Sequence, residues 1–157
     1  MVVRVQREDF DVGRELETLT AGNTRIGGLA SFVGLVRDMA PETGGERGRI
    51  GAMTLEHYPG MTEKKLAGIE AEARQRWPLE ASLIVHRYGR LEPGDRIVLV
   101  ATASPHRAAA LESCQFLIDW LKTEAPFWKL EETSDGTARW VEARAADDAA
   151  ARRWTGK

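Results

Sequence analysis

The chain has 157 residues, of which 43% are hydrophobic and 29% charged, and its formal net charge is −2. This length predicts one domain, residues 1–157, with enough chain to bury a core. No apolar run approaches the ~20 residues that a membrane span requires, and the N-terminus lacks the apolar stretch of a signal peptide, so we expect a cytoplasmic protein. The slightly acidic balance argues against nucleic acid or a membrane as a partner, so any anion site must come from a local cluster of cationic side chains.

The first third of the chain predicts two strands around a helix. Residues 2–6 are typical of a short strand, and Asp11 is a good N-cap for a helix over 11–20. Glycines interrupt the apolar stretch 25–37, which favours a strand with bulges or a close backbone approach over a helix. The Pro- and Gly-rich residues 38–49 predict a loop that either stays solvated or closes over a ligand.

The middle of the chain predicts a strand over 50–58, a helix over 59–77 and a hairpin of strands 81–89 and 96–103. Pro93 and Gly94 supply the turn of that hairpin. The inner side of the helix is expected to hold Met61, Leu66, Ile69, Ala73 and Trp77.

The last third predicts a long helix, a second hairpin and a short terminal helix. The long helix is expected from Ser104 to about Thr123, stopped by Pro126. Strands over 127–133 and 138–144 form the hairpin, and residues 147–154 form the terminal helix. This order lacks the regular alternation of a doubly wound fold, so the sequence predicts an α+β domain with a largely antiparallel sheet and an added β-hairpin subdomain.

The single cysteine, Cys114, excludes an internal disulfide and any metal site with several thiolates. Its helical neighbours Leu111, Leu117, Ile118 and Leu121 favour a buried, unreactive position for its thiol. The three histidines, at 57, 86 and 106, form no helical pair of the kind that binds metal. We therefore expect neither a structural metal nor a bound cofactor.

The segment Ser104–Arg107, SPHR, is typical of a helix start, with serine at the N-cap and proline at the first helical position. This places His106 and Arg107 in the first turn, where the helix dipole disfavours cations. Their presence is explained if an anion such as a phosphate binds there; the alternative is an exposed helix start with incidental charge.

Two lysines, Lys122 and Lys129, flank a proline and two aromatic residues. In the simplest interpretation Lys122 closes a helix and Lys129 lies on a strand surface; in the alternative the turn at Pro126 brings both amines to one pocket. Glu131 shares a strand face with Lys129 and is placed to pair with it, whereas Trp128 is expected to pack on the other face.

A continuous helix separates His106 from Lys122 by roughly 24 Å, at about 1.5 Å for each of the sixteen residues. One small substrate cannot span that distance within one chain. Either the helix breaks, or the SPHR turn of a second copy completes the site across a two-fold axis. We favour the second option, which predicts a homodimer.

Several motifs together resemble the catalytic (large) subunit of molybdopterin synthase, the MoaE family. They are FVGLVRD, LEHYPGMTEKKL, SPHR, DWLKTEAPFWKLEE and WVEAR, and the resemblance extends from about Ile26 to Trp154. It implies an α/β-hammerhead fold and a sulfurtransferase of molybdenum cofactor biosynthesis that converts cyclic pyranopterin monophosphate (precursor Z) into molybdopterin by adding two dithiolene sulfurs. The sulfur comes from the C-terminal thiocarboxylate of a small ubiquitin-like partner, the MoaD-like subunit, within a heterotetramer built on a central homodimer.

The resemblance also assigns roles to residues. It makes Lys122 and Lys129 catalytic, with Lys122 nearer the acyl carbon of the partner's tail and Lys129 in an acid/base and electrostatic role. The implied substrate-binding residues are Leu35, Val36, Arg37, His106, Arg107, Lys122, Lys129, Leu130, Glu131 and Arg144. Many family members have a basic residue at the position of Leu130, so its presence leaves open how much positive charge surrounds the pocket.

Two other functions remain to be weighed. A scaffold that captures a ubiquitin-like tail or a phosphorylated metabolite would need the arginines but would tolerate loss of both lysines. A nucleic-acid-binding protein would use arginines and the five tryptophans to stack bases, but the acidic balance and the absence of a basic stripe oppose it.

Overall fold

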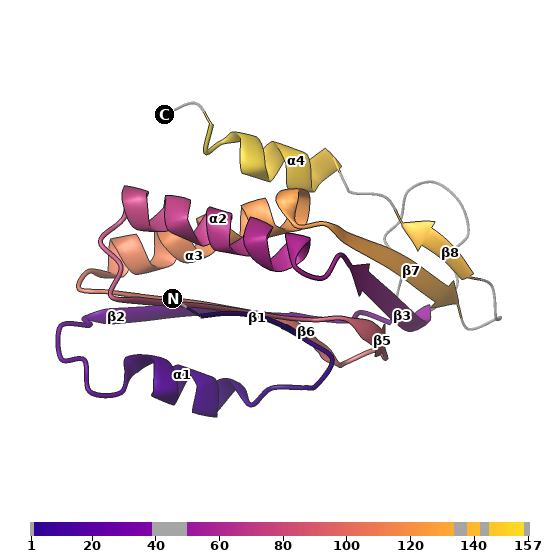
Figure 1. The fold of residues 1–157 in the computed structure, drawn as a ribbon, viewed down its shortest axis with the longest axis horizontal. Coiled ribbons are helices and arrows are strands. Elements are labelled where there is room, and N and C mark those ends of the chain that lie inside the picture. The colour runs from indigo at the N-terminus through magenta and orange to yellow at the C-terminus, as the bar shows by residue number, and fades with distance from the viewer. Residues whose placement is uncertain (1, 39–49, 134–137, 142–144, 156–157) are drawn as a thin grey trace.

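The computed structural model describes residues 2–38, 50–133, 138–141 and 145–155, which form two four-stranded sheets with helices packed on them (Figure 1). The first sheet has the order β1-β4-β6-β2. Its strands are β1 (Val2–Gln6), β4 (Ala81–Arg87), β6 (Arg96–Ser104) and β2 (Gly28–Leu35). Only β1 and β4 pair in parallel; the other neighbours are antiparallel, as expected for the α+β class.

The second sheet lies at one end of the first and projects past the helices that cover it (Figure 1). Its order is β5-β3-β7-β8, and every neighbouring pair is antiparallel. The strands are β5 (Gly89–Leu91), β3 (Ile50–His57), β7 (Phe127–Thr133) and β8 (Ala138–Val141). Among the described residues, the antiparallel pairs β4–β6 and β7–β8 confirm the two predicted hairpins, while residues 142–144 of the second predicted strand lie outside the description. The strand β5 was not predicted, because three residues are too few to carry a periodic signal.

Helices cover both faces of the first sheet. Figure 1 shows α1 (Val12–Thr20) on one face, α2 (Met61–Arg76) and α3 (Arg107–Glu124) on the other, and α4 (Ala145–Arg152) outside α3. The central strands β4 and β6 are therefore apolar and buried over most of their length. No helix among these residues is long and apolar enough to cross a bilayer.

Apolar side chains form a cluster on each face of the first sheet and a third at its junction with the second sheet. The α2/α3 side includes Phe116, Leu66, Ile84, Val100 and Cys114; the α1 side includes Phe10, Leu83, Val85 and Leu99; the junction holds Val36, Met53, Leu55 and Leu91. Removing this apolar surface from water stabilises the arrangement of the elements.

Three local predictions were wrong. Met61 is 53% exposed, because it lies five positions, or about 140° around the helix at ~100° per residue, from the buried Leu66. Leu111 is also exposed, although Leu117, Ile118 and Leu121 are buried as expected. Ser104 is not the N-cap of α3 but the last residue of β6, where it pairs with Gly28, and His106 is the N-cap.

A buried carboxylate fixes the C-terminal helix against α3. Asp119 accepts hydrogen bonds from the Arg153 guanidinium at 2.9 Å and from the Trp154 indole at 2.7 Å, and its side chain is almost fully buried. A paired and hydrogen-bonded carboxylate avoids the cost of burying a lone charge. The contact holds the chain after α4 close to the end of α3 that carries Lys122.

Candidate active site

The two lysines lie on either side of a tight turn between α3 and β7. The helix ends at Glu124, and its C-cap residue Ala125 donates its N–H to Leu121. Ala125 in turn accepts a hydrogen bond from the backbone N–H of Phe127, the first residue of β7, at 2.8 Å. Lys122 therefore lies in the last helical turn, exposed, and Lys129 is the third residue of the strand, half-buried.

Aromatic rings pack against the first residue of β7, Phe127, at this turn. The imidazole of His86, on β4, stacks on Phe127 with 3.8 Å between ring centroids and 17° between planes. The ring centroid of His57 lies 6.3 Å from that of Phe127 and 4.3 Å from that of Tyr88. The buried hydroxyl of Thr62 donates to the carbonyl of Pro126 at 3.4 Å.

Both lysines lie close enough to the buried imidazole of His86 to influence its pKa. Burial lowers that pKa to about 4; the hydrogen bond to the Arg87 carbonyl opposes the shift, and the charges of Lys122, Lys129 and His57 lower it further. Charges act on a titratable group in this way only from its neighbourhood. The turn therefore brings both ammonium groups to the same region of the protein.

The sheet register places Glu131 on the same face as Lys129. In the β3–β7 ladder Lys129 lies opposite Leu55 and Glu131 opposite Met53, and Glu131 is 3% exposed. Successive side chains of a strand point to opposite faces, so Trp128 and Leu130 point away from Lys129. Leu130 is therefore on the wrong face to determine the charge beside the lysine.

Trp128 packs less than expected. Its ring meets Tyr58 edge-on with centroids 4.2 Å apart, but 40% of the residue remains exposed.

Arg37 follows the end of β2 at the junction of the two sheets. The ladder register shifts between Gly34 and Leu35, as expected for an irregular strand, but the unpaired residue is Ile97 of the partner strand β6, since Gly34 lies opposite Val98 and Leu35 opposite Arg96. Val36 is then held by hydrogen bonds to Asp95 and Gly94, and its side chain packs in the cluster that contains Met53 and Leu55. The exposed Arg37 thus follows a buried residue that packs on β3, the neighbour of the strand β7 that carries Lys129 and Glu131; Leu35 is exposed.

The SPHR turn lies at the opposite end of α3. Gly27 donates its N–H to Ser104 at 2.9 Å, and a Cβ at Gly27 would lie 2.1 Å from the Pro105 carbonyl oxygen, so only glycine allows this close approach. His106 and Arg107 are exposed at the helix start, and the first turn contains no acidic residue. The structure shows one uninterrupted helix from Arg107 to Glu124, so one copy of the chain does not bring the SPHR turn to the lysines.

Arg144, the remaining predicted site residue, lies outside the described residues. Within the described part of the chain, no group of three or more metal-ligating side chains comes together. Sequence reasoning did not single out His57, His86 or Thr62 around the lysine turn. The available signal for His86 was a titratable residue inside the apolar run of a predicted buried strand.

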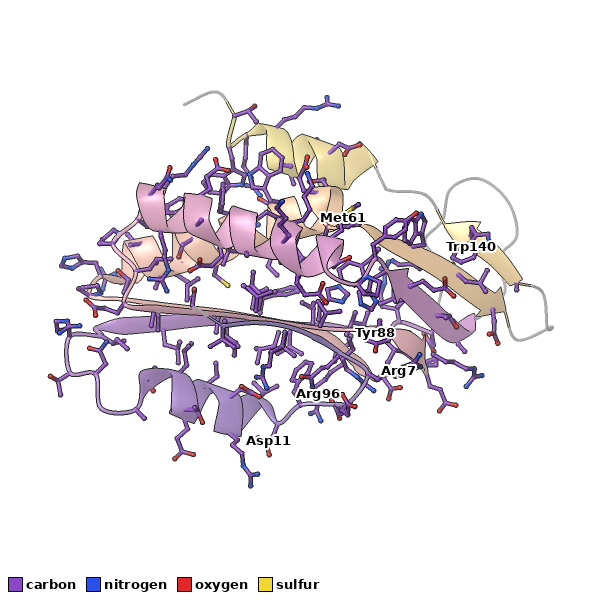
Figure 2. The ribbon with its side chains drawn as sticks, in the orientation of Figure 1. Arg7, Asp11, Met61, Tyr88, Arg96 and Trp140 are labelled. Atoms are coloured by element: carbon purple, nitrogen blue, oxygen red, sulfur yellow. The ribbon has the colours of Figure 1, made fainter. Side chains whose placement is uncertain are left out.

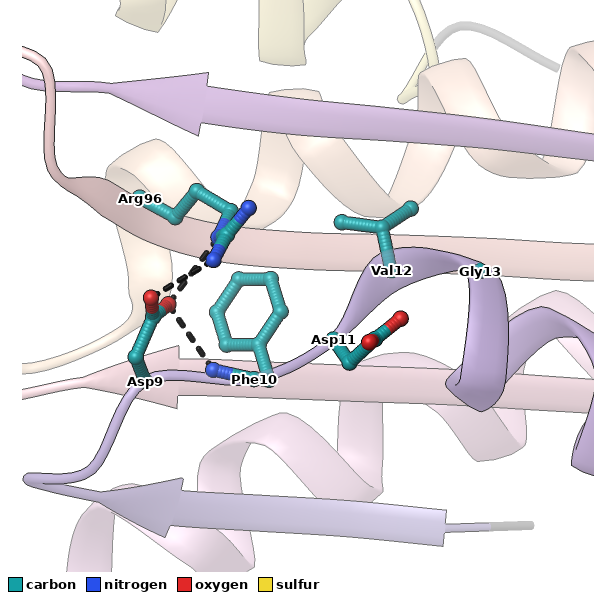
Figure 3. A pocket seen from close by; sticks show the side chains of 6 residues that line it. All are labelled: Asp9, Phe10, Asp11, Val12, Gly13 and Arg96. Atoms are coloured by element: carbon teal, nitrogen blue, oxygen red, sulfur yellow. Dashed lines mark hydrogen bonds and ion pairs between the residues drawn. The ribbon is translucent and has the colours of Figure 1, made fainter.

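A pocket beside the N-terminus of α1 is separate from the lysine turn. It is lined by Asp9 to Gly13 and Arg96 (Figure 3). Arg96 donates two hydrogen bonds to Asp9, at 2.6 and 3.0 Å, and its guanidinium lies over the ring of Phe10. The hydrogen bond from Arg96 is the main cause that lowers the pKa of Asp9 to about 2. Because these two charges satisfy each other, we assign the pocket a structural role.

Comparison with known proteins decides the family. A model described as "MoaE protein" matches residues 5–124, more than half of the chain. The molybdopterin synthase catalytic subunit of Pseudomonas aeruginosa is 55% identical over 98% of this chain and 99% of its own length. The chain belongs to the MoaE family.

Solved structures agree with this membership. The MoaE protein of Burkholderia ambifaria is 54% identical, with a TM-score of 0.82 over 99% of both chains. A complex of subunits 1 and 2 of the molybdopterin-converting factor from Helicobacter pylori contains a chain with a TM-score of 0.69 over 92% of both chains, and its 20% identity shows a likeness of fold alone. The activity of this MoaE family member is that of a molybdopterin synthase catalytic subunit, an enzyme of molybdenum cofactor biosynthesis.

Cys114 does not have the properties of a sulfur carrier in this enzyme. Burial raises the pKa of its thiol to about 11, so the thiolate required for persulfide chemistry is scarce at neutral pH. The prediction that Cys114 is buried is confirmed.

Proposed function

We propose that Lys122 and Lys129 together catalyse the transfer of sulfur from a thiocarboxylate to cyclic pyranopterin monophosphate, forming the dithiolene of molybdopterin. The observation that carries this proposal is the α3–β7 turn, which brings both lysine charges to the neighbourhood of the buried His86 ring and the Phe127 ring stacked on it. The thiocarboxylate, the substrate phosphate and a tetrahedral adduct on the acyl carbon are all anions. Ammonium groups held in a partly dry site stabilise such charge.

The lysines take different parts in this proposal. Lys122 lies nearer the acyl carbon of the donor's tail, and Lys129 supplies acid/base and electrostatic assistance. For each sulfur added, a C–S bond forms on the pterin, an oxygen leaves with a proton, and water releases the donor's tail as a carboxylate. A lysine beside the reacting atoms is suited to move those protons. Arg37 and Arg144 add positive charge, and Glu131 orients Lys129.

The donor in this proposal is a small ubiquitin-like subunit of the MoaD type. Two observations support a separate donor protein: Cys114 is buried as a thiol, and the Helicobacter pylori relative is a complex of two subunits of molybdopterin-converting factor. Lys122 is exposed, so the extended tail of a carrier protein can reach it from solvent.

We further propose that two copies of the chain share each active site. The uninterrupted α3 removes the alternative in which a helix break brings His106 and Arg107 to the lysines of the same copy. The SPHR turn of one copy then binds the substrate phosphate beside the lysines of the other, within a heterotetramer. The same proposal includes a single functional domain, an α/β-hammerhead fold and a cytoplasmic location.

A reconstituted turnover assay tests the catalytic proposal. The protein is mixed with a thiocarboxylated small subunit and cyclic pyranopterin monophosphate, and dithiolene product is measured for the intact chain, Lys122→Ala and Lys129→Ala. We expect product from the intact chain, a loss of at least about 100-fold in Lys122→Ala and a smaller loss in Lys129→Ala. Equal losses would contradict the ranking of the two lysines.

The same assay separates the enzyme from the scaffold. The Lys122→Ala/Lys129→Ala double variant should still bind the small subunit in a pull-down but should not turn over. Undiminished turnover by this double variant would contradict the catalytic proposal.

A further inference from the structure

The stacked rings of His86 and Phe127 at the α3–β7 turn join parts of the protein that are distant in sequence. His86 belongs to the first sheet and Phe127 to the second, and they stack nearly parallel at 3.8 Å. Phe127 is five residues after Lys122 and two before Lys129. A displacement of this ring therefore moves the start of the strand that carries Lys129 relative to the helix end that carries Lys122.

His86 is itself tightly held. It is 5% exposed on the central strand β4, and its Nδ1 lies 2.8 Å from the carbonyl oxygen of Arg87. A carbonyl only accepts, so Nδ1 carries the proton and the ring orientation is fixed. Burial keeps the imidazole neutral at neutral pH, with a pKa of about 4, so it adds no third positive charge beside the lysines.

Phe127 is clamped from several directions. In the β3–β7 ladder His57 lies opposite Phe127. The backbone N–H of Phe127 donates a hydrogen bond to the carbonyl of Ala125, and the carbonyl of Pro126 accepts one from the Thr62 hydroxyl. Of the two histidine rings near Phe127, that of His86 is the closer and the more nearly parallel.

Building on the catalytic role proposed above for the two lysines, we propose that His86 is a positioning residue for sulfur transfer: its ring face holds Phe127, and through it fixes Lys129 relative to Lys122. His86 touches no reacting atom in this account. A small misplacement of catalytic groups, on the order of 1 Å, can cost about 100-fold in rate, so a ring that fixes their separation affects kcat more than substrate binding.

Two substitutions of His86 separate ring stacking from the other properties of the imidazole. His86→Phe and His86→Leu both remove the hydrogen bond to Arg87 and the titration, but only phenylalanine keeps a flat ring against Phe127. We expect kcat to fall at least about tenfold in His86→Leu and to stay within about threefold of the intact protein in His86→Phe, with KM for the pterin and binding of the small subunit unchanged in both. Trp77→Leu, which removes a ring from a different part of the core, is the control and should lower thermal stability without changing kcat.

A second pair of variants covers the case in which His86→Leu does not fold. Phe127→Leu and Phe127→Tyr test the same contact from the less buried partner, and we expect only leucine to lower kcat. The His86→Leu/Phe127→Leu double variant should lose no more of its kcat than Phe127→Leu alone, because each substitution removes the same ring contact. Equal kcat in the leucine and ring-containing variants, or additive losses, would overturn the proposal.

A readout without turnover keeps this test independent of the proposed function. The amide resonances of residues 127–129, which follow Pro126, should shift strongly in His86→Leu and little in His86→Phe. If the intact protein makes no product, the catalytic proposal fails, and these resonances still decide whether His86 positions the strand. Identical shifts in both variants would overturn the positioning role.

Discussion

At the residue scale, burial determines which ionisable side chains can take part in chemistry. Cys114 lies in the cluster between α3 and the first sheet, where the pKa of its thiol is raised to about 11. We predict that Cys114→Ser folds and keeps its turnover with the thiocarboxylated donor within about threefold of the intact protein, because the sulfur comes from the partner. Loss of turnover in a variant that keeps its circular dichroism spectrum and its binding of the small subunit would reopen a persulfide route.

His86 makes stability depend on pH. Its pKa in the folded protein is about 4, below the ordinary 6.5, so between these values the unfolded chain binds the proton more readily. The free energy of unfolding is therefore unaffected by this titration above pH 6.5 and decreases as the pH falls towards 4. The decrease amounts to about 3 kcal/mol, at 1.36 kcal/mol per pKa unit.

Chemical denaturation of the intact protein and His86→Phe measures this effect. The difference in their free energies of unfolding should become less favourable to the intact protein between pH 7 and pH 4. Asp9, whose pKa is lowered to about 2 chiefly by its hydrogen bond from Arg96, is present in both proteins and cancels in the comparison. A difference that does not change with pH would contradict the neutral, buried state of His86.

At the element scale, the SPHR turn depends on Gly27, the residue before β2, where the backbone passes close to Pro105. A Cβ at Gly27 would lie 2.1 Å from the Pro105 carbonyl oxygen, so the backbone itself must move. We predict that Gly27→Ala lowers the free energy of unfolding by about 2 kcal/mol or more. The control is Gly68→Ala within α2, where no atom lies within 4 Å of the added Cβ, and we expect this change to stabilise by roughly 0.5–1 kcal/mol. Thermal and denaturant unfolding of the two variants should therefore differ in sign.

The elements themselves could be predicted where their signal is long and local. The 3.6-residue pattern of α2, the Asp11 N-cap of α1 and the proline that stops α3 all act within a few residues, and the structure confirms each. The start of α3 was predicted too early because Ser104 is held in the β6–β2 ladder, a contact with a segment far away in sequence.

At the scale of the whole molecule, the candidate site could be predicted only in part. The lysine turn followed from sequence because Pro126 must end a helix, and the glycine-bearing strand before Arg37 followed from its apolar run. The stack of His86 on Phe127 could not be predicted, since it joins two sheets whose relative placement depends on the packing of the whole core. The opposite faces of Lys129 and Leu130 follow from strand alternation once β7 is known.

The two ends of α3 lie in different parts of the molecule. Figure 2 shows the exposed side chains of Met61, at the start of α2, and Trp140, on β8, at the end of the protein where the chain passes from α3 into β7. The SPHR turn lies at the other end of the same helix, roughly 24 Å from Lys122 at about 1.5 Å per residue. If the SPHR turn and Lys122 bind the same substrate molecule, the SPHR turn of one copy of the chain must lie beside Lys122 of a second copy.

A complementation experiment tests the shared site most directly. Lys122→Ala and the His106→Ala/Arg107→Ala double variant are produced with different tags, and dimers that contain one copy of each are isolated and assayed for dithiolene formation. Each variant alone should be inactive. In the mixed dimer one site collects both defects and the other collects none, so we expect about half of the activity of the intact dimer. A mixed dimer no more active than its two parents would contradict the shared active site.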